Sequence, residues 1–456
     1  MVYLLFETTM PALYSASHST LAPSKVRNDV HSLPLLSVLF FSLVFIKPSS
    51  STIVPVPVPA VATEASSAFR VIWNAPSQVC EKCGGLPLER YGIEANANES
   101  FIGETIACLY SGSFGLWPKL NVSLNATPCW TGQTPCSWTP WSTIDVLENG
   151  GVPQAANLTL HLEKVSTDVV RAIPDSTFSG MIILDFEEWR PVLSSNFDAL
   201  SYNIVYSRSL VQNKHPEWNA SRVQTTAAAE FNTAALSFFV QTVRTIRKLR
   251  PVAKIGYYEW PSDSGVEVDD MLQELWKEVD VMAPSVYPRY TDVNRQANWT
   301  IGKILESQRV QKKYGRRGSV VMAYTRAFVQ NQQVLSREQL ATQIQIAAGL
   351  GAEGIILWGS SADYATGCGQ REPHGPAAGS CMQVAKELES VAGPLVFSCQ
   401  QNRNACRATH CSGHGRCIDY NGEASQLESV CLTTLPVLSC RCDTDWLGAD
   451  CGSFVH

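Results

Sequence analysis

Two acidic side chains, Asp185 and Glu187, stand two positions apart at the end of the apolar run Met181 to Leu184. Successive side chains of a β-strand point to opposite faces, so residues two apart share a face. Both carboxyls are therefore expected to project together from the end of one buried strand. Paired carboxyls can supply the acid and the base that glycosidic-bond cleavage needs. A solvated strand end or a helix start is the alternative interpretation of this pair.

The segments around this pair alternate short apolar runs with stretches of helical periodicity. The strand candidates are residues 69–73, 180–185, 253–258, 279–287, 319–324 and 354–358. Apolar residues recur at helical spacing over 236–249 and over 340–347, and Ser336 with Gln339 predicts a capping box before the second stretch. Strands that alternate with helices over about 320 residues favour an α/β fold with a closed parallel barrel.

Several of the predicted strands end in a polar or aromatic residue that a core does not require. Besides Asp185 and Glu187, these residues are Tyr258, Ser285, Tyr287, Tyr324 and Trp358. In a βα barrel the carboxyl ends of the strands line the active-site face, so their recurrence there favours a functional site. Ordinary rim or core aromatics are the alternative interpretation of each residue taken singly.

The composition indicates a protein of the secretory pathway, extracellular or lysosomal. The chain has 15 cysteines and six N-glycosylation sequons, at Asn98, Asn121, Asn125, Asn157, Asn219 and Asn298. Eight of the cysteines fall between Cys399 and Cys451 without the paired Cys-x-x-Cys spacing that is typical of zinc sites. We therefore expect no metal and no cofactor. The net charge of −6 gives no global basic field, which argues against a nucleic-acid partner.

We expect four segments along the chain. Residues 1–48 form a leader whose apolar run, 33–46, is typical of a signal peptide and too short to span a bilayer. A short signal anchor or a misassigned start codon is the alternative. Residues 49–67 are a linker rich in Pro, Ser and Val, residues 68–398 the barrel, and residues 399–456 a cysteine-rich module. No stable membrane span is expected, and the protein is expected to be a monomer.

At these residues the sequence resembles the hyaluronidase family of animals and venoms, from about Phe69 to Cys451. The matching segments are V-I-W-N-A-P-S-Q-V-C at 71–80, G-G-V-P-Q at 150–154, D-F-E-E-W-R-P at 185–191, G-Y-Y-E-W-P at 256–261, P-S-V-Y at 284–287 and I-L-W-G-S at 356–360. Two departures stand out. Phe186 occupies a position where Trp is more usual, and S-D-S at 262–264 replaces a segment where the family commonly has a cysteine.

The resemblance implies a distorted TIM-like (β/α) barrel that cuts internal β-1,4 bonds of hyaluronan, and also of chondroitin, as an endo-β-N-acetylhexosaminidase. Glu187 is then the general acid and base. The substrate's own acetamido oxygen replaces a carboxylate nucleophile, and Asp185 and Tyr287 orient it. The residues that bind substrate are then Tyr258, Trp358, Tyr324, Ser285 and Arg289.

The physical chemistry of two neighbouring carboxyls agrees with this assignment. In a partly dry cleft they cannot both ionise easily, so one pKa should rise, and we expect Glu187 to hold the proton.

A polyanionic substrate requires local positive charge, because the chain is acidic overall. Arg190, Arg289 and Arg326 lie near predicted strand ends and are the candidate cations. Arg190 can equally form a structural ion pair with Glu188. Contacts to the sugar rings are expected from Trp260 and from the strand-end aromatics.

The segment from Cys406 to Cys451 resembles a small disulfide-rich module of the epidermal-growth-factor type, which the family often carries. The resemblance implies the pairs Cys406–Cys417, Cys411–Cys440, Cys442–Cys451 and, within the barrel, Cys80–Cys381. Spacing alone does not select these pairs. The cysteines without an assigned partner are Cys83, Cys108, Cys129, Cys136, Cys368, Cys399 and Cys431. Their odd number implies one thiol that is free or paired between chains.

Two functional hypotheses follow. The first is a secreted endo-hexosaminidase, and the second is a glycan-binding or adhesion protein that uses the same barrel without turnover. A lectin needs the aromatics but not a protonated acid, so the pair of Asp185 and Glu187 favours the enzyme. A chitinase-like enzyme is disfavoured, because the longer run of acids typical of such chitinases is absent before Asp185.

Overall fold

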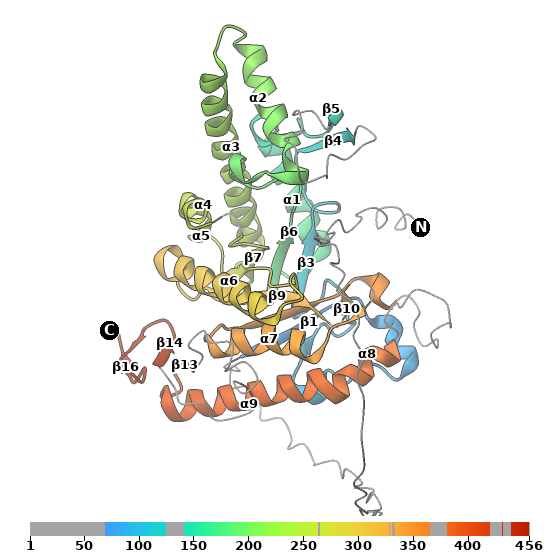
Figure 1. Ribbon diagram of the computed structural model, residues 1–456, viewed down its shortest axis with the longest axis vertical. Coiled ribbons are helices and arrows are strands. Elements are labelled where there is room, and N and C mark those ends of the chain that lie inside the picture. The colour runs from blue at the N-terminus through green and yellow to red at the C-terminus, as the bar shows by residue number, and fades with distance from the viewer. Residues whose placement is uncertain are drawn as a thin grey trace, which may run out of the picture. The chain divides into compact units, whose positions relative to one another are not determined.

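Eight parallel strands form the sheet that holds the candidate site (Figure 1). The computed structural model describes residues 69–124, 141–262, 265–327, 329–330, 333–364, 381–419, 431 and 439–455. These residues belong to one unit that spans 60–456. The leader and linker expected at 1–67 lie outside the described residues.

The sheet is a nearly closed barrel with the strand order β2-β1-β12-β9-β8-β7-β6-β3. Its strands are β1 (Arg70–Asn74), β2 (Glu94–Ala95), β3 (Ile106–Tyr110), β6 (Met181–Asp185), β7 (Lys254–Tyr258), β8 (Val281–Ala283), β9 (Val320–Arg326) and β12 (Gly354–Trp358). The predicted α/β barrel is thus confirmed, and each of the six strand candidates overlaps a strand. The strands β2 and β3 were not predicted, because two residues carry no periodicity and I-A-C-L-Y does not alternate polar with apolar residues.

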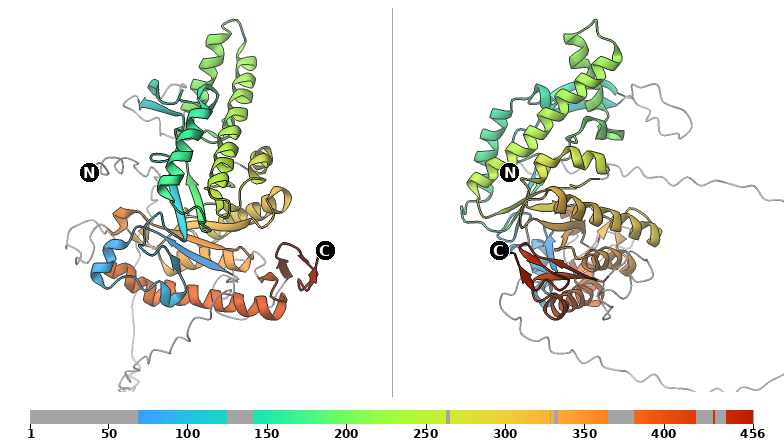
Figure 2. Two further views of the ribbon diagram at one scale, coloured as in Figure 1. Left: turned by 180° about the vertical axis from the view of Figure 1, so that it is seen from behind. Right: turned by 90° about the vertical axis from the view of Figure 1, so that its left-hand side faces the viewer.

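Helices follow the strands and cover the outside of the barrel (Figure 1). They are α1 (Leu158–Ala172), α2 (Tyr202–Lys214), α3 (Ala220–Leu249), α4 (Val266–Met271), α5 (Gln273–Trp276), α6 (Val293–Tyr314), α7 (Arg337–Gly349), α8 (Cys381–Glu387) and α9 (Gly393–His410). Both predicted helices are confirmed within α3 and α7, and Ser336 and Gln339 form the predicted capping box. The helices α2 and α3 lie side by side as an antiparallel pair (Figure 2).

Short antiparallel hairpins complete the described structure. They are β4 (Lys119–Leu124) with β5 (Trp141–Glu148), β10 (Val329–Gln330) with β11 (Gln333–Val334), β13 (Gly415–Ile418) with β14 (Ser439–Cys442), and β15 (Trp446–Leu447) with β16 (Ser453–Phe454).

One asparagine side chain closes the seam where the barrel sheet ends, between β2 and β3. The Asn96 amide donates to the carbonyl oxygen of Ile106 over 2.9 Å. Its Oδ1 accepts from the backbone N–H groups of Thr105 and Ile106, both at 3.0 Å. The side chain therefore replaces part of the ladder that β2 is too short to form, and it satisfies backbone groups that burial would otherwise leave unpaired.

Alternation along each strand divides the apolar residues between two cores. In β6, Ile182 and Leu184 pack outward against the helices, whereas Met181 and Ile183 point into the barrel. The inward residues form one interior cluster with Ile72, Ile106, Val281, Ala283, Val320, Met322, Tyr324 and Ile356. At Gly256, which is also inward, a Cβ atom would collide with the carbonyl oxygen of Val281. The interior is therefore filled with side chains, and only the strand ends are left to form a site.

The four disulfides that the resemblance implies are all present. The structure pairs Cys80 with Cys381, Cys406 with Cys417, Cys411 with Cys440 and Cys442 with Cys451. It adds a bridge between Cys399 and Cys431, and Cys83 is also disulfide-bonded. Within the described part of the chain, Cys108 is the one free thiol. Cys129, Cys136 and Cys368 lie outside the described residues.

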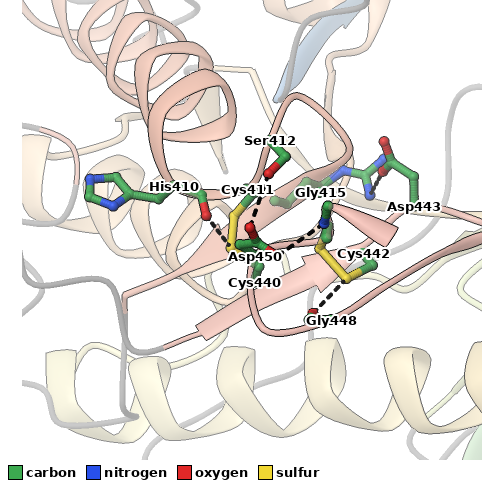
Figure 3. The surroundings of a disulfide bond; sticks show 12 residues. His410, Cys411, Ser412, Gly415, Cys440, Cys442, Asp443, Gly448 and Asp450 are labelled. Carbon is green, nitrogen blue, oxygen red and sulfur yellow. Dashed lines mark hydrogen bonds and ion pairs between the residues drawn. A yellow bond between two sulfur atoms is a disulfide. The ribbon is translucent and has the colours of Figure 1, made fainter. Parts of the chain in front are cut away.

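The cysteine-rich segment is joined to the barrel by α9 and by ion pairs, and Figure 3 shows Cys411, Cys440 and Cys442 among the bridged cysteines within it. The boundary expected between residues 398 and 399 falls inside α9, which continues to His410 because no helix-breaking residue interrupts it. Arg416 on β13 lies 3.3 Å from Glu353, just before β12, and 3.0 Å from Asp443 within the segment. The Asp419 N–H donates to the carbonyl oxygen of Gly349 at the end of α7. These contacts join the segment to the barrel end opposite the carboxyl ends of the strands.

Candidate active site

The carboxyl ends of the barrel strands bring together residues from seven distant parts of the chain. The inward alternation of each strand ends in a polar or aromatic residue, and these residues are Asn74 on β1, Tyr110 on β3, Asp185 on β6, Tyr258 on β7, Tyr324 on β9 and Trp358 on β12. Beyond β8, Ser285 and Tyr287 continue the same alternation, and Ser285 forms a parallel bridge with Tyr324. This is the face on which βα barrels carry their active sites.

Asp185 and Glu187 lie next to each other in this mouth, and both hold their protons unusually firmly. Burial, followed by the nearby charge of Glu259, raises the pKa of Asp185 to about 7. Burial, followed by the charges of Asp185 and Glu259, raises the pKa of Glu187 to about 8. Glu187 is nevertheless exposed to solvent, so its side chain is accessible to a ligand.

Three tyrosines pack against one another beside the acids. The rings of Tyr258 and Tyr324 lie 5.2 Å apart, and those of Tyr258 and Tyr287 lie 6.1 Å apart. The Tyr258 hydroxyl donates to Ser285 Oγ over 3.4 Å. Burial raises the pKa of Tyr258 and that of Tyr287, so both phenols stay protonated and can donate hydrogen bonds.

A row of stacked rings leads away from the acids. Tyr287 stacks on Trp358 at 6.1 Å, and Trp358 stacks on Phe101 at 6.5 Å. The Trp358 indole N–H donates to the Tyr110 hydroxyl over 2.9 Å, which fixes the plane of the indole ring. Such a row offers flat apolar faces against which sugar rings can pack. Phe101 and Tyr110 were not predicted as site residues from the sequence. Tyr110 had the same signal as the other aromatics, a final position on a strand, but its strand was not recognised.

Two of the expected aromatic contacts differ in the structure. Trp260 is only 3% exposed and packs against Phe239 and Trp276, so it belongs to the outer core and cannot offer a ring face to a sugar. Tyr324 is 1% exposed, and its hydroxyl accepts a hydrogen bond from the Asn74 amide over 3.0 Å. Tyr324 therefore lies beneath the site and supports Tyr258.

The candidate cations occupy three different environments. Arg326 lies over the Trp358 ring at 4.7 Å and 3.6 Å from Asp363. Arg289 is exposed, with its guanidinium 5.9 Å from the Tyr290 ring and 6.0 Å from the Trp299 ring. Only Arg326 of these two lies against an aromatic ring of the mouth.

Arg190 forms an ion pair, but not with the partner considered from the sequence. Its guanidinium lies 3.1 Å from Glu259. Glu188 instead lies 3.4 Å from Lys119. Sequence spacing favoured a neighbour, whereas the fold brings the loops after β6 and β7 together. Glu259 was not recognised as a site residue from the sequence, because a single acid after a strand is no stronger a signal than any surface carboxylate.

The five described asparagines of the sequons are all exposed: Asn98, Asn121, Asn157, Asn219 and Asn298. Asn157 and Asn219 are helix N-caps, whose Oδ1 atoms accept from Leu160 N–H and Arg222 N–H. A glycan attaches at Nδ2 and leaves Oδ1 free, so glycosylation is compatible with both caps. Glycosylation itself stays a prediction. Asn125 lies outside the described residues.

The described residues contain neither a metal-binding group nor a membrane-spanning helix. No group of three or more His, Cys, Asp or Glu side chains in them is arranged to hold a metal ion. No helix among them is long and apolar enough to cross a membrane.

Comparison with known proteins agrees with this geometry. The chain is 30% identical over 357 residues to a hyaluronidase of Apis mellifera, which covers 74% of this chain and 86% of that protein. It is 25% identical over 408 residues to a chondroitin hydrolase of Caenorhabditis elegans, which covers 84% of this chain and 79% of that protein. The solved structure of bee venom hyaluronidase with a hyaluronic acid tetramer superposes with a TM-score of 0.60 at 29% identity, over 72% of this chain and 98% of that one.

The sequence pattern of the hyaluronidase family matches residues 59–135 and 140–433, which include every strand of the barrel and both acids at its mouth. With that match, the nearly closed parallel barrel and the aromatic-lined mouth, this chain belongs to the hyaluronidase family of glycoside hydrolases.

Proposed function

We propose that this enzyme is a secreted endo-β-N-acetylhexosaminidase that hydrolyses the β-1,4 bonds of hyaluronan, and also of chondroitin. The observation that carries the proposal is the pair of carboxyls, Asp185 and Glu187, whose raised pKa values leave a proton available in the barrel mouth. The named activities of the relatives, hyaluronidase and chondroitin hydrolase, support both substrates. An extracellular or lysosomal location and a monomeric state complete the proposal.

In the proposed reaction, Glu187 gives its proton to the glycosidic oxygen as that bond breaks. The acetamido carbonyl oxygen of the same sugar attacks the anomeric carbon and forms a cyclic intermediate, so no carboxylate becomes bonded to the sugar. Water then attacks the anomeric carbon, which opens this cyclic intermediate, and gives a proton back to Glu187. Both displacements occur at the anomeric carbon, so its configuration is retained.

Asp185 and Tyr287 hold the acetamido group during this attack. Asp185 accepts a hydrogen bond from the N–H of the acetamido group. The protonated hydroxyl of Tyr287 donates a hydrogen bond to the acetamido carbonyl oxygen before the cyclic intermediate forms. The sugar lies against Trp358 and Tyr258, with Ser285 fixing the Tyr258 hydroxyl. Arg326 is the cation best placed to offset a substrate carboxylate, because it lies over the Trp358 ring.

The Glu187→Gln variant tests this mechanism. The amide keeps the shape of the side chain but cannot deliver a proton, so kcat on hyaluronan is expected to fall about 10²–10⁴-fold. The release of new reducing ends measures the loss. Glu274→Gln is the matched control, because it makes the same change at an exposed residue of α5 that pairs with Lys277, and it should leave kcat near the wild-type value.

The same assay with hyaluronan, chondroitin and chitin oligosaccharides across pH 3.5 to 7.5 separates the alternative functions. Binding without new reducing ends indicates a glycan-binding protein on the same barrel, and cleavage of chitin alone indicates a chitinase-like enzyme. A Glu187→Gln variant as active as the wild type would falsify the role given to Glu187.

A further inference from the structure

Glu259 occupies an unusual backbone position at the edge of the active site. It lies between Tyr258, the last residue of β7, and the buried Trp260. Its φ of 73° lies in the left-handed region, which is strained for a residue other than glycine. Because the residues on both sides are held by the sheet and by the core, the strained backbone directs the Glu259 side chain toward the loop that follows β6.

The contact of Glu259 with that loop is close and partly shielded from water. Its carboxylate lies 3.1 Å from the Arg190 guanidinium, and the two side chains are 25% and 19% exposed. Arg190 also donates to the carbonyl oxygen of Ser195 over 3.5 Å and lies 5.1 Å from the Phe197 ring. Glu259 thus holds Arg190 between the two loops that carry the acids and Tyr258.

The charges that face Glu187 come from both loops. Asp185 on β6, Glu188 on the same loop and Glu259 beyond β7 are acidic, Arg190 is basic, and the neutral Tyr258 hydroxyl comes from β7. The charge of Glu188 is offset by Lys119 at 3.4 Å. Arg190 favours the ionised form of Glu187, whereas Glu259 favours the protonated form and also offsets Arg190.

We propose that Glu259 is a positioning residue for the hydrolytic reaction, which holds Arg190 and supplies the negative charge that keeps a proton on Glu187. This inference rests on the proposed role of Glu187 as the acid. Without Glu259, no carboxylate would offset the positive charge of Arg190 beside Glu187. Glu187 would then lose its proton at a lower pH.

The pH profile of Glu259→Gln tests the proposal. The amide oxygen can still accept from Arg190 but carries no charge. The alkaline limb of kcat/KM is therefore expected to move to lower pH by about 0.5–1 unit, with activity on the acidic side near that of the wild type. Glu274→Gln, which removes an exposed ion pair with Lys277 on α5, is the control and should leave the limb in place.

A second variant, Glu259→Gly, separates charge from backbone strain. Glycine adopts positive φ without cost, so this variant should melt at a higher temperature than Glu259→Gln while showing the same shift of the limb. A limb that stays in place in both variants, or an activity loss that is equal at every pH, overturns the proposal.

A readout that needs no turnover keeps this inference separate from the proposed function. A raised pKa of Glu187 makes the thermal stability of the wild type fall between pH 4.5 and 8, and this fall should be shallower in Glu259→Gln. An unchanged slope contradicts the role of Glu259 even if the enzyme proves inactive on every substrate tested, and an active wild type whose Glu187→Gln variant keeps full activity contradicts only the proposed acid.

Discussion

At the scale of single residues, the acidity of Glu187 is a property of its surroundings. A free glutamic acid is ionised at neutral pH, but the partly dry mouth and the charges of Asp185 and Glu259 raise the pKa of Glu187 to about 8. The proposed mechanism uses the protonated acid that this cluster of carboxyls favours.

This arrangement has a consequence for stability that can be measured. The pKa of Glu187 rises from an ordinary value of 4.5 in the unfolded chain to about 8 in the folded protein. Between these pH values the folded state binds more protons than the unfolded state, so the contribution of Glu187 to stability is complete below pH 4.5 and is lost as the pH rises toward 8.

Glu187→Gln removes this loss, because the amide does not titrate. The variant should equal the wild type in free energy of unfolding at pH 4.5 and exceed it by about 1 kcal/mol at pH 8, a value reduced because water reaches this side chain. Urea unfolding at the two pH values checks the prediction, with Glu274→Gln as the control. A difference of the same size at both pH values would show that titration is not its cause.

At the scale of the elements, the barrel sheet is left unpaired between β2 and β3. The short β2 forms few ladder bonds, and the Asn96 side chain supplies the missing pairing across the seam. Asn96 is 1% exposed, so water cannot replace these hydrogen bonds.

Asn96→Ala should therefore lower the free energy of unfolding by about 2–4 kcal/mol, because it leaves several buried backbone groups without partners. Urea unfolding measures the change. Asn213→Ala on the exposed surface of α2 is the matched control and should change stability by less than about 0.5 kcal/mol. Equal losses in the two variants would mean that the seam does not depend on Asn96.

At the scale of the whole molecule, disulfides tie distant parts of the chain together. The bridge from Cys80 to Cys381 spans 301 positions and joins the region after β1 to the start of α8. The bridge from Cys442 to Cys451 spans only 9 positions within the cysteine-rich segment. A bridge that closes a longer loop restricts the unfolded chain more, so the first should contribute more stability.

The double variant Cys80→Ala and Cys381→Ala is expected to lose about 3–5 kcal/mol of unfolding free energy, against about 2 kcal/mol for Cys442→Ala and Cys451→Ala. Unfolding in denaturant without reductant gives both values. If the short bridge proved the more stabilising, loop closure would not be the dominant effect.

The sequence by itself determined most of the barrel strands, two of the helices and the position of the two acids near the end of one strand. Hydrophobic periods of two and of 3.6 residues predicted six of the eight barrel strands and the helices α3 and α7. Ser336 and Gln339 predicted the capping box of α7. The placement of Asp185 at the inner end of β6 followed from strand geometry alone, whereas Glu187 lies two residues beyond the end of that strand. These features depend on residues that are neighbours along the chain, so local rules were enough.

The tertiary structure decided which residues meet across the mouth. The pairing of Arg190 with Glu259, the burial of Trp260 and the support that Asn74 gives to Tyr324 join segments that lie far apart in the sequence. No local pattern encodes these contacts, because they depend on how neighbouring strands align and how their loops fold over the barrel. Strand alternation could thus predict that Asp185 ends the inward face of its strand, but only the closed barrel determines which charges lie around Asp185 and Glu187.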